Sequence, residues 1–155
     1  MTTSESERYI VRKPLQATGS PLVKGRQTPM VYLSSRQVPE TCAHIELSWI
    51  HGMPEPNPYL QQRTLDYDQI LLHIGMDCTK PQVLGGAVEL VLGGQPVAFN
   101  TTTAVFIPRG TSYGPLTYKD FQRPHLQMSI VLGSGDPSAG AAQGAGGAAA
   151  AMTAP

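Results

Sequence analysis

Residues 102–118 read TTAVFIPRGTSYGPLTY, and they join a strand-like run to a tight turn. Within them, residues 103–107 alternate between two sets of side chains, which is the period of a strand with at least one buried face. Residues 108–110 (PRG) then end the strand, because proline lacks an amide hydrogen and glycine accepts a positive φ. We therefore predict that the next strand begins directly afterwards and places Tyr113 at the mouth of a barrel.

Short segments with the strand period recur along the rest of the chain, about every 8–12 residues. They read RYIVRK (8–13), PMVYL (29–33), TCAHIELSWI (41–50), DYDQILLHIG (66–75), AVELVL (87–92), QPVAFN (95–100), LTY (116–118) and LQMSIVL (126–132). The prolines at 54, 56 and 58 predict a loop over residues 51–58, because proline fixes φ and cannot donate a hydrogen bond. No segment is periodic over enough residues to predict a helix. Roughly nine or ten short strands indicate an all-β fold.

Two of these segments have two chemically distinct faces. Residues 41–50 place Ile45, Leu47 and Trp49 on one side of the strand and His44, Glu46 and Ser48 on the other. Residues 66–75 likewise separate Gln69, Leu71 and His73 from Ile70, Leu72 and Ile74. We expect the face with Gln69 and His73 to meet the barrel interior.

The composition suits one domain. The chain has 155 residues, and 11 Lys plus Arg balance 11 Asp plus Glu, which argues against nucleic acid or an anionic membrane as partner. The longest apolar run, residues 145–152, is too short to span a bilayer, and residues 1–9 lack the apolar core of a signal peptide. We therefore expect a soluble cytoplasmic protein in which the isolated Cys42 and Cys78 stay reduced.

Three regions differ in composition. Residues 1–7 are polar and predict a flexible N-terminus. Residues 8–133 carry all the strand-like segments and predict one β-barrel domain. Residues 134–155 consist mainly of alanine and glycine, which offer almost no side chain to bury, so we predict a disordered tail.

Several segments carry a resemblance to a known family. They are WIHGMPEPNP, DYDQILLHIG, LGGAVELVLGG, TAVFIPRGTSYGPLTY and RPHLQMSIVLG. Over residues 8–133 the chain resembles small single-domain bacterial cupins, which implies an RmlC-like double-stranded β-helix, a jelly-roll barrel. The second cupin motif is Pro-x-Gly-x-x-His, and here Tyr113 stands where the histidine would be.

The resemblance also implies where a metal would bind. Cupins hold a metal with two histidines and a glutamate from the first motif and with the histidine of the second. Aligned on residues 66–68, these positions fall on Arg63, Leu65, Gln69 and Tyr113, and none of the four is a good ligand. The resemblance therefore implies a barrel without its metal centre and without a cofactor.

The four histidines allow an alternative. An unorthodox metal site could be built from His73, His125 and His51, because His73 is expected to face the interior and His125 precedes a neighbouring strand. For each of these side chains, and for His44, a hydrogen-bonded structural imidazole is the simpler interpretation.

The candidate ligand-binding residues are Arg63, Gln69, His73, Tyr113 and His125. Tyr113 and Gln69 would face each other inside the barrel and orient a small ligand by hydrogen bonds, and Arg63 at the mouth could clamp a carboxylate or phosphate. These residues favour a metal-free module that binds a small organic molecule or serves as a scaffold.

Two other functions stay open at this point. The first is a cupin enzyme, with a histidine metal site or with metal-free acid/base chemistry, for which Tyr113 is the candidate catalytic residue and would need a lowered pKa. The second is a structural protein that assembles through edge strands and the alanine-rich tail. The resemblance also implies a homodimer, and we expect residues 8–13 to be the strand exchanged between its subunits.

Overall fold

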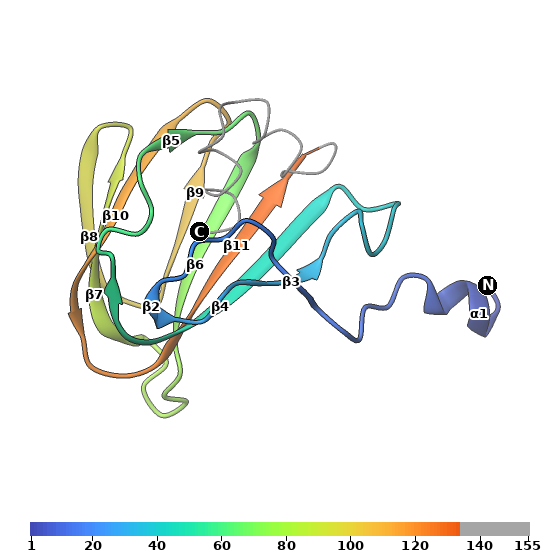
Figure 1. Ribbon diagram of the computed structural model, residues 1–155, viewed down its shortest axis with the longest axis horizontal. Helices are drawn as coiled ribbons and strands as arrows, with labels where there is room; N and C mark the ends of the chain where they lie inside the picture. The colour runs from blue at the N-terminus through green and yellow to red at the C-terminus, as the bar shows by residue number, and fades with distance from the viewer. Residues whose placement is uncertain (134–155) are drawn as a thin grey trace.

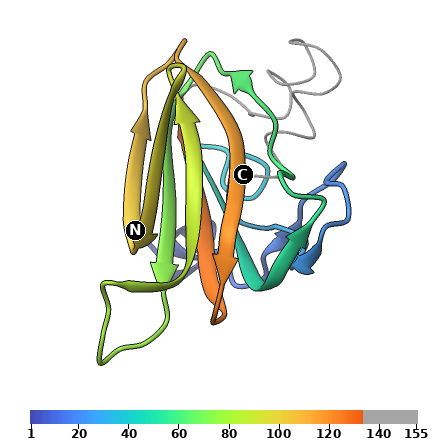
Figure 2. The same cartoon turned by 90° about the vertical axis from the view of Figure 1, so that its left-hand side faces the viewer.

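A computed structural model describes residues 1–133 and shows two antiparallel β-sheets facing each other (Figures 1 and 2). The seven-stranded sheet has the order β1-β3-β4-β11-β6-β9, with β2 also paired to β4. Its strands are β1 (Leu15–Gln16), β2 (Lys24–Arg26), β3 (Met30–Leu33), β4 (Ala43–Glu55), β6 (Asp68–Gly75), β9 (Thr103–Ile107) and β11 (His125–Leu132). The four-stranded sheet has the order β5-β10-β7-β8 and consists of β5 (Arg63–Thr64), β7 (Val83–Leu92), β8 (Gln95–Thr101) and β10 (Ser112–Phe121). The predicted all-β jelly roll is confirmed.

Most of the predicted strands are present. The segments at 29–33, 41–50, 66–75, 87–92, 95–100, 103–107 and 126–132 correspond to β3, β4, β6, β7, β8, β9 and β11. The turn after β9 also has the predicted backbone, since Gly110 has a φ of 81°. The glycine pair between β7 and β8 forms the expected hairpin, with positive φ at both Gly93 and Gly94.

Three predictions about secondary structure are wrong. Residues 8–13 form no strand, because they pair with no other segment, and Tyr9 and Ile10 are exposed. Residues 51–55 continue β4, where their pairing with β2 keeps the chain extended despite Pro54. A short helix, α1 (Thr3–Glu7), lies at the N-terminus because Thr2 and Glu5 form a capping box. It projects from the barrel (Figure 1).

The two sheets differ in their inner faces. The four-stranded sheet contributes apolar side chains such as Val88, Leu90 and Leu116 to the core. The seven-stranded sheet contributes some apolar residues, but most of its buried inner side chains are polar. They are Arg26, His44, Glu46, Ser48, Gln69, His73, His125, Gln127 and Ser129. This polar inner face defines the region where a ligand could bind.

Other predictions concern the surface and the chain ends. Cys42 and Cys78 are exposed and unpaired within the described residues. In the same part of the chain, no helix has the length and hydrophobicity needed to cross a bilayer. The predicted tail, residues 134–155, lies outside the described residues.

Candidate ligand-binding site

The polar inner face follows from the register of three adjacent strands. β11 lies between β4 and β6, with Gln127 opposite Ser48 on one side and His73 on the other. Because side chains alternate along a strand, the polar residues of these three strands share one side of the sheet. All of them are at most 7% exposed, so each needs a hydrogen-bond partner inside the barrel.

His73 belongs to a chain of hydrogen bonds through the interior. Tyr59 donates its hydroxyl to Gln127 Oε1 over 2.6 Å, and Gln127 Nε2 donates to His73 Nε2 over 3.2 Å. His73 Nε2 must therefore be the acceptor, which places the proton of the neutral ring on Nδ1. Burial lowers the pKa of His73 to about 3, and the nearby His125 and Arg26 act in the same direction, so this imidazole is neutral near pH 7.

His125 has partners for both ring nitrogens. Its Nδ1 donates to the carbonyl oxygen of Arg123 over 3.0 Å, so Nε2 accepts from the Tyr118 hydroxyl, also at 3.0 Å. The Tyr118 ring stacks on this imidazole, with 5.7 Å between the centroids. Burial lowers the pKa of His125, against the opposing effect of the Arg123 carbonyl. His125 is therefore a neutral, hydrogen-bonded part of the core.

Arg63 and Tyr113 lie side by side in the four-stranded sheet, on β5 and β10. They are register partners across the short pairing of β5 with β10, and the guanidinium carbon lies 5.7 Å from the centre of the phenol ring. Gly114 makes this pairing possible. Its φ is 93°, and a side chain there would meet Gln61 O at 2.5 Å, so only glycine lets residues 61–63 approach β10 this closely.

Three polar groups of this cluster are buried without a hydrogen-bond partner among the described residues. They are Nε and Nη1 of Arg63, the hydroxyl of Tyr113 and Oε1 of Gln69. Gln69 Nε2 donates to Ser129 Oγ over 2.7 Å, which leaves Oε1 as the free end of that amide. Arg63 and Gln69 nevertheless lie close enough to the Tyr113 hydroxyl for side-chain hydrogen bonding to lower its pKa, so the three groups face one another in one place.

The protonation states of this cluster follow from burial. Burial raises the pKa of Tyr113 to about 12, although Arg63 and Gln69 both act to lower it. Burial also lowers the pKa of Arg63 to about 10, with Tyr113 opposing that change. The phenol is therefore protonated and the guanidinium is charged near pH 7, so both can donate hydrogen bonds.

Comparisons with known proteins identify the architecture. No family model matches the chain, and neither does any curated protein. Its structure is similar to a predicted oxalate decarboxylase from Thermotoga maritima, with 12% identity, 79% of this chain and 97% of that chain covered, and a TM-score of 0.51. The barrel is a cupin-type jelly roll.

Two further structures were found. An RmlC-like cupin from Shewanella frigidimarina matches with 9% identity, 77% and 82% coverage of this chain and that chain, and a TM-score of 0.47. The cupin domain of Schizosaccharomyces pombe Cnp3 matches with 12% identity, 76% and 78% coverage, and a TM-score of 0.47. At these identities the similarity concerns the cupin fold alone.

The residues present do not fit a cupin metal. Four positions of this chain align with the metal ligands of cupins. Three of them, Arg63, Gln69 and Tyr113, lie close together, whereas the fourth, Leu65, lies in the apolar core. Within residues 1–133 no group of three or more His, Cys, Asp or Glu side chains could hold a metal ion.

The alternative histidine site does not fit a metal either. An imidazole binds a metal through the lone pair of an unprotonated nitrogen. In His73 and His125 that nitrogen already accepts a hydrogen bond from the protein. The third candidate, His51, is exposed on β4, with its side chain alternating away from the buried face.

Sequence reasoning missed several interior groups. Arg26 is 5% exposed and its guanidinium lies 4.7 Å from the centre of the Tyr59 ring. Glu46 is 1% exposed and accepts a hydrogen bond from His44 Nε2 over 2.8 Å. Burial raises the pKa of Glu46, although His44, Arg26 and Arg63 oppose that change. The alternation of residues 44–48 contained the signal for Glu46, while Arg26 lies in a segment that reads as loop.

Proposed function

We propose that this chain is a metal-free cupin domain that binds a small organic carboxylate inside its barrel, beside Arg63 and Tyr113. The observation that carries the proposal is the Arg63 guanidinium, two of whose nitrogens are buried without a partner among the described residues. Leaving a buried charged donor unpaired is costly, and a carboxylate is the anion that best matches a guanidinium. A bound carboxylate would satisfy these nitrogens.

The charge inside the barrel also favours an anion. Two arginines, Arg26 and Arg63, act electrostatically on Glu46, which is the one buried carboxylate among the described residues. Since His73 and His125 are neutral, two guanidinium groups and one carboxyl group leave this interior with a net positive charge. An anionic ligand would reduce that charge, whereas a cation would be repelled.

The neighbours of Arg63 suggest the rest of the ligand. Tyr113 can donate its hydroxyl to a second carboxylate oxygen, and Gln69 Oε1 can accept from a hydroxyl or amino group. A short acid with such a group next to its carboxylate would satisfy all three. Tyr113 then serves as a binding residue, because a phenol with a pKa of about 12 is poorly suited to acid/base chemistry near pH 7.

Calorimetric titration with two acids of similar size tests this proposal. We expect lactate to bind at least about tenfold more tightly than propionate, because only lactate offers a donor to Gln69. Arg63→Gln should weaken lactate binding at least about tenfold, and Tyr113→Phe should weaken it less. Arg109→Gln is the matched control, because Arg109 is an exposed arginine paired with Asp66.

Three outcomes would contradict the proposal. One is a complete absence of binding across a panel of small mono- and dicarboxylates. Another is binding that Arg63→Gln and Arg109→Gln reduce equally, which would indicate a general effect of charge. The third is near-stoichiometric retention of Fe, Mn, Ni or Zn by protein purified without chelator, which would overturn the metal-free assignment.

A further inference from the structure

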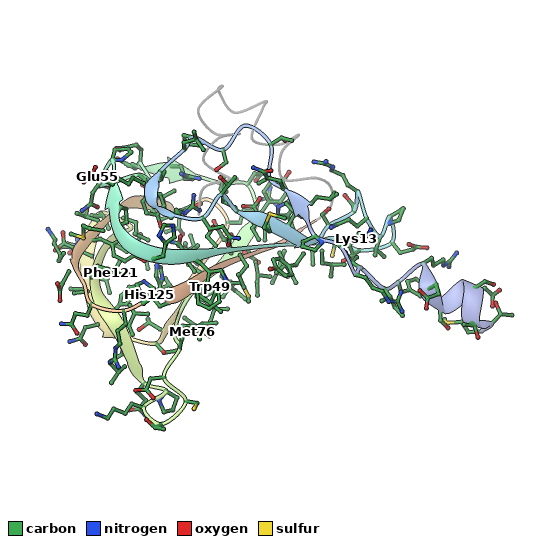
Figure 3. The ribbon with its side chains drawn as sticks, turned by 60° about the horizontal axis from the view of Figure 1, so that its bottom comes forward. Lys13, Trp49, Glu55, Met76, Phe121 and His125 are labelled. Atoms are coloured by element: carbon green, nitrogen blue, oxygen red, sulfur yellow. The ribbon has the colours of Figure 1, made fainter. Side chains whose placement is uncertain are left out.

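A second group of unpaired polar atoms lies inside the barrel, on β4. The side chains of His44, Glu46 and Ser48 share the inner side of this strand and are at most 7% exposed. Trp49, which Figure 3 labels on the same strand, alternates with them and is 38% exposed on the outer side. Within the described residues, Oε2 of Glu46 and Oγ of Ser48 have no hydrogen-bond partner. The proposed carboxylate site uses neither atom.

The register places Glu46 close to the proposed carboxylate site. Ser129 of β11 is the register partner of Glu46, and such partners have Cα atoms about 5 Å apart. From β6, on the other side of β11, Gln69 Nε2 donates to the Ser129 hydroxyl over 2.7 Å. Glu46 and Gln69 therefore flank the same serine, and Arg63 acts electrostatically on Glu46. The unpaired oxygen of Glu46 thus extends the polar region that begins at Arg63.

The nearby charges decide which ligand group suits Glu46. His44 already donates to Oε1 of this carboxyl group over 2.8 Å, and the guanidinium groups of Arg26 and Arg63 act on it electrostatically. An ammonium group at this position would be attracted by one negative charge and repelled by two positive charges. A hydroxyl group carries no charge and can both donate and accept, so it can pair with Oε2 of Glu46 or with Oγ of Ser48.

We infer that the ligand of this barrel is a polyhydroxy acid, whose carboxylate binds at Arg63 and Tyr113 while hydroxyl groups further along its carbon chain bind Glu46 and Ser48. This inference rests on the proposed function and extends the site across β11 to β4. Leaving buried polar atoms unpaired is costly, so a ligand that pairs with them gains affinity. An acid without the additional hydroxyl groups leaves both atoms unpaired.

A dicarboxylate is the competing ligand, because Arg26 adds a positive charge to the interior and is 5% exposed. A second carboxylate accepts hydrogen bonds but donates none, so it cannot pair with the carboxylate oxygen of Glu46. It would also place a second negative charge beside that oxygen. Hydroxyl groups avoid both problems.

Calorimetric titration with 2-hydroxy acids of four carbons tests the inference. 2-Hydroxybutyrate has no further polar group, whereas the erythronates and threonates, the stereoisomers of 2,3,4-trihydroxybutyrate, have a hydroxyl group on each of the two remaining carbons. We expect one of these stereoisomers to bind at least about tenfold more tightly than 2-hydroxybutyrate, because it offers donors to Glu46. Malate, with a carboxylate at the far end, and 4-amino-2-hydroxybutyrate, with an ammonium group there, should bind more weakly than that stereoisomer.

Variants of β4 locate the additional hydroxyl groups. Glu46→Met should reduce the preference for the trihydroxy acid over 2-hydroxybutyrate at least about fivefold, while 2-hydroxybutyrate still binds. A purely structural role of Glu46 would weaken both acids equally. Glu89→Met is the matched control, because Glu89 lies on β7 of the other sheet and pairs with Lys119; it should keep the preference of the wild type.

Ser48→Ala gives a second test that does not depend on the folding of Glu46→Met. The Ser48 hydroxyl has no partner among the described residues, so its removal breaks no hydrogen bond of the fold. This variant should also reduce the preference for the trihydroxy acid, by a smaller factor than Glu46→Met, because the hydroxyl of serine is uncharged. Circular dichroism of each variant shows whether it is folded.

Four results would overturn the inference. Equal affinities for 2-hydroxybutyrate and every trihydroxy acid would do so and would leave the proposed carboxylate site intact. Tightest binding of malate or of 4-amino-2-hydroxybutyrate would assign another class of ligand. A preference that neither Glu46→Met nor Ser48→Ala reduces would place the additional hydroxyl groups elsewhere. Absence of binding by all of these acids would overturn both this inference and the proposed function.

Discussion

The two sheets of this barrel distribute their side chains in opposite ways. In the four-stranded sheet, Leu90 and Leu116 point into the core while Glu89 and Thr117, paired across β7 and β10, point outward. That is the usual arrangement of an antiparallel sheet with one solvated face. In the seven-stranded sheet, polar residues line the inside and apolar residues cover the outside.

This difference shows what each sheet contributes. Apolar burial in the four-stranded sheet stabilises the fold. The seven-stranded sheet places hydrogen-bonding groups inside, where they stabilise the fold less and would recognise the proposed ligand, and it leaves apolar side chains outside. The following substitutions test how the two sheets differ.

The largest effect is expected in the inner face of the four-stranded sheet. Leu90→Ala removes a side chain that is 1% exposed and should lower the free energy of unfolding by about 3 kcal/mol, because the cavity cannot collapse fully. Urea denaturation measures this. Val91→Ala, on the opposite face of the same strand, is the control and should cost less than about 1 kcal/mol. Equal losses would mean that this sheet has no distinct inner face.

Gly114→Ala should destabilise by about 2–3 kcal/mol. The new side chain would combine a positive φ with an approach of 2.5 Å to Gln61 O. Gly94→Ala separates the effect of the positive φ from the effect of the close approach. Gly94 has a φ of 80° with nothing within 4 Å of an added Cβ, so this variant should lose only about 1 kcal/mol of unfolding free energy. If the two variants were equally stable, close approach of residues 61–63 to β10 would not matter.

The inner face of the seven-stranded sheet should respond to pH through His73. Its pKa in the folded chain, about 3, lies below the ordinary value of 6.5, so the unfolded chain binds the proton first as pH falls. The stability contributed by neutral His73 is therefore complete above pH 6.5 and is lost between pH 6.5 and 3, by about 1.4 kcal/mol per pH unit.

His73→Gln is the matched variant, because glutamine can accept the hydrogen bond from Gln127 and does not titrate. Urea denaturation at pH 7 and pH 5 should show that the wild type loses about 2 kcal/mol more than the variant over this interval. His125 titrates in both proteins and cancels from the difference. Identical pH dependence would mean that His73 is solvated.

The sequence predicted the strands well, because most of them alternate and several end at proline or glycine. The strand assignments failed where the local preference of a segment and its pairing in the folded chain disagree. Pro54 suggested a loop, yet pairing with β2 extends β4 to Glu55. Residues 8–13 have strand-like side chains but no neighbouring strand to pair with.

The candidate site could be predicted only in part. The turn at Pro108 and the resemblance to cupins placed Gln69 and Tyr113 together, and the structure brings Arg63 beside them. Alternation reveals two faces of a strand, but it does not say which face is inside. Arg26 reaches the interior from the three-residue strand β2 and Tyr59 from an irregular segment, and neither is long enough to show a periodicity.

The smallest effect is expected on the outer side of the seven-stranded sheet. Phe106 is 54% exposed on the edge strand β9, so Phe106→Thr should change the free energy of unfolding by less than about 1 kcal/mol. Threonine preserves the strand preference. Val97→Thr, on the outside of the other sheet, should behave alike, as measured by urea denaturation.

A loss above about 2 kcal/mol for Phe106→Thr would contradict this view. The outer side of β9 would then belong to the core, covered by other residues of the same chain.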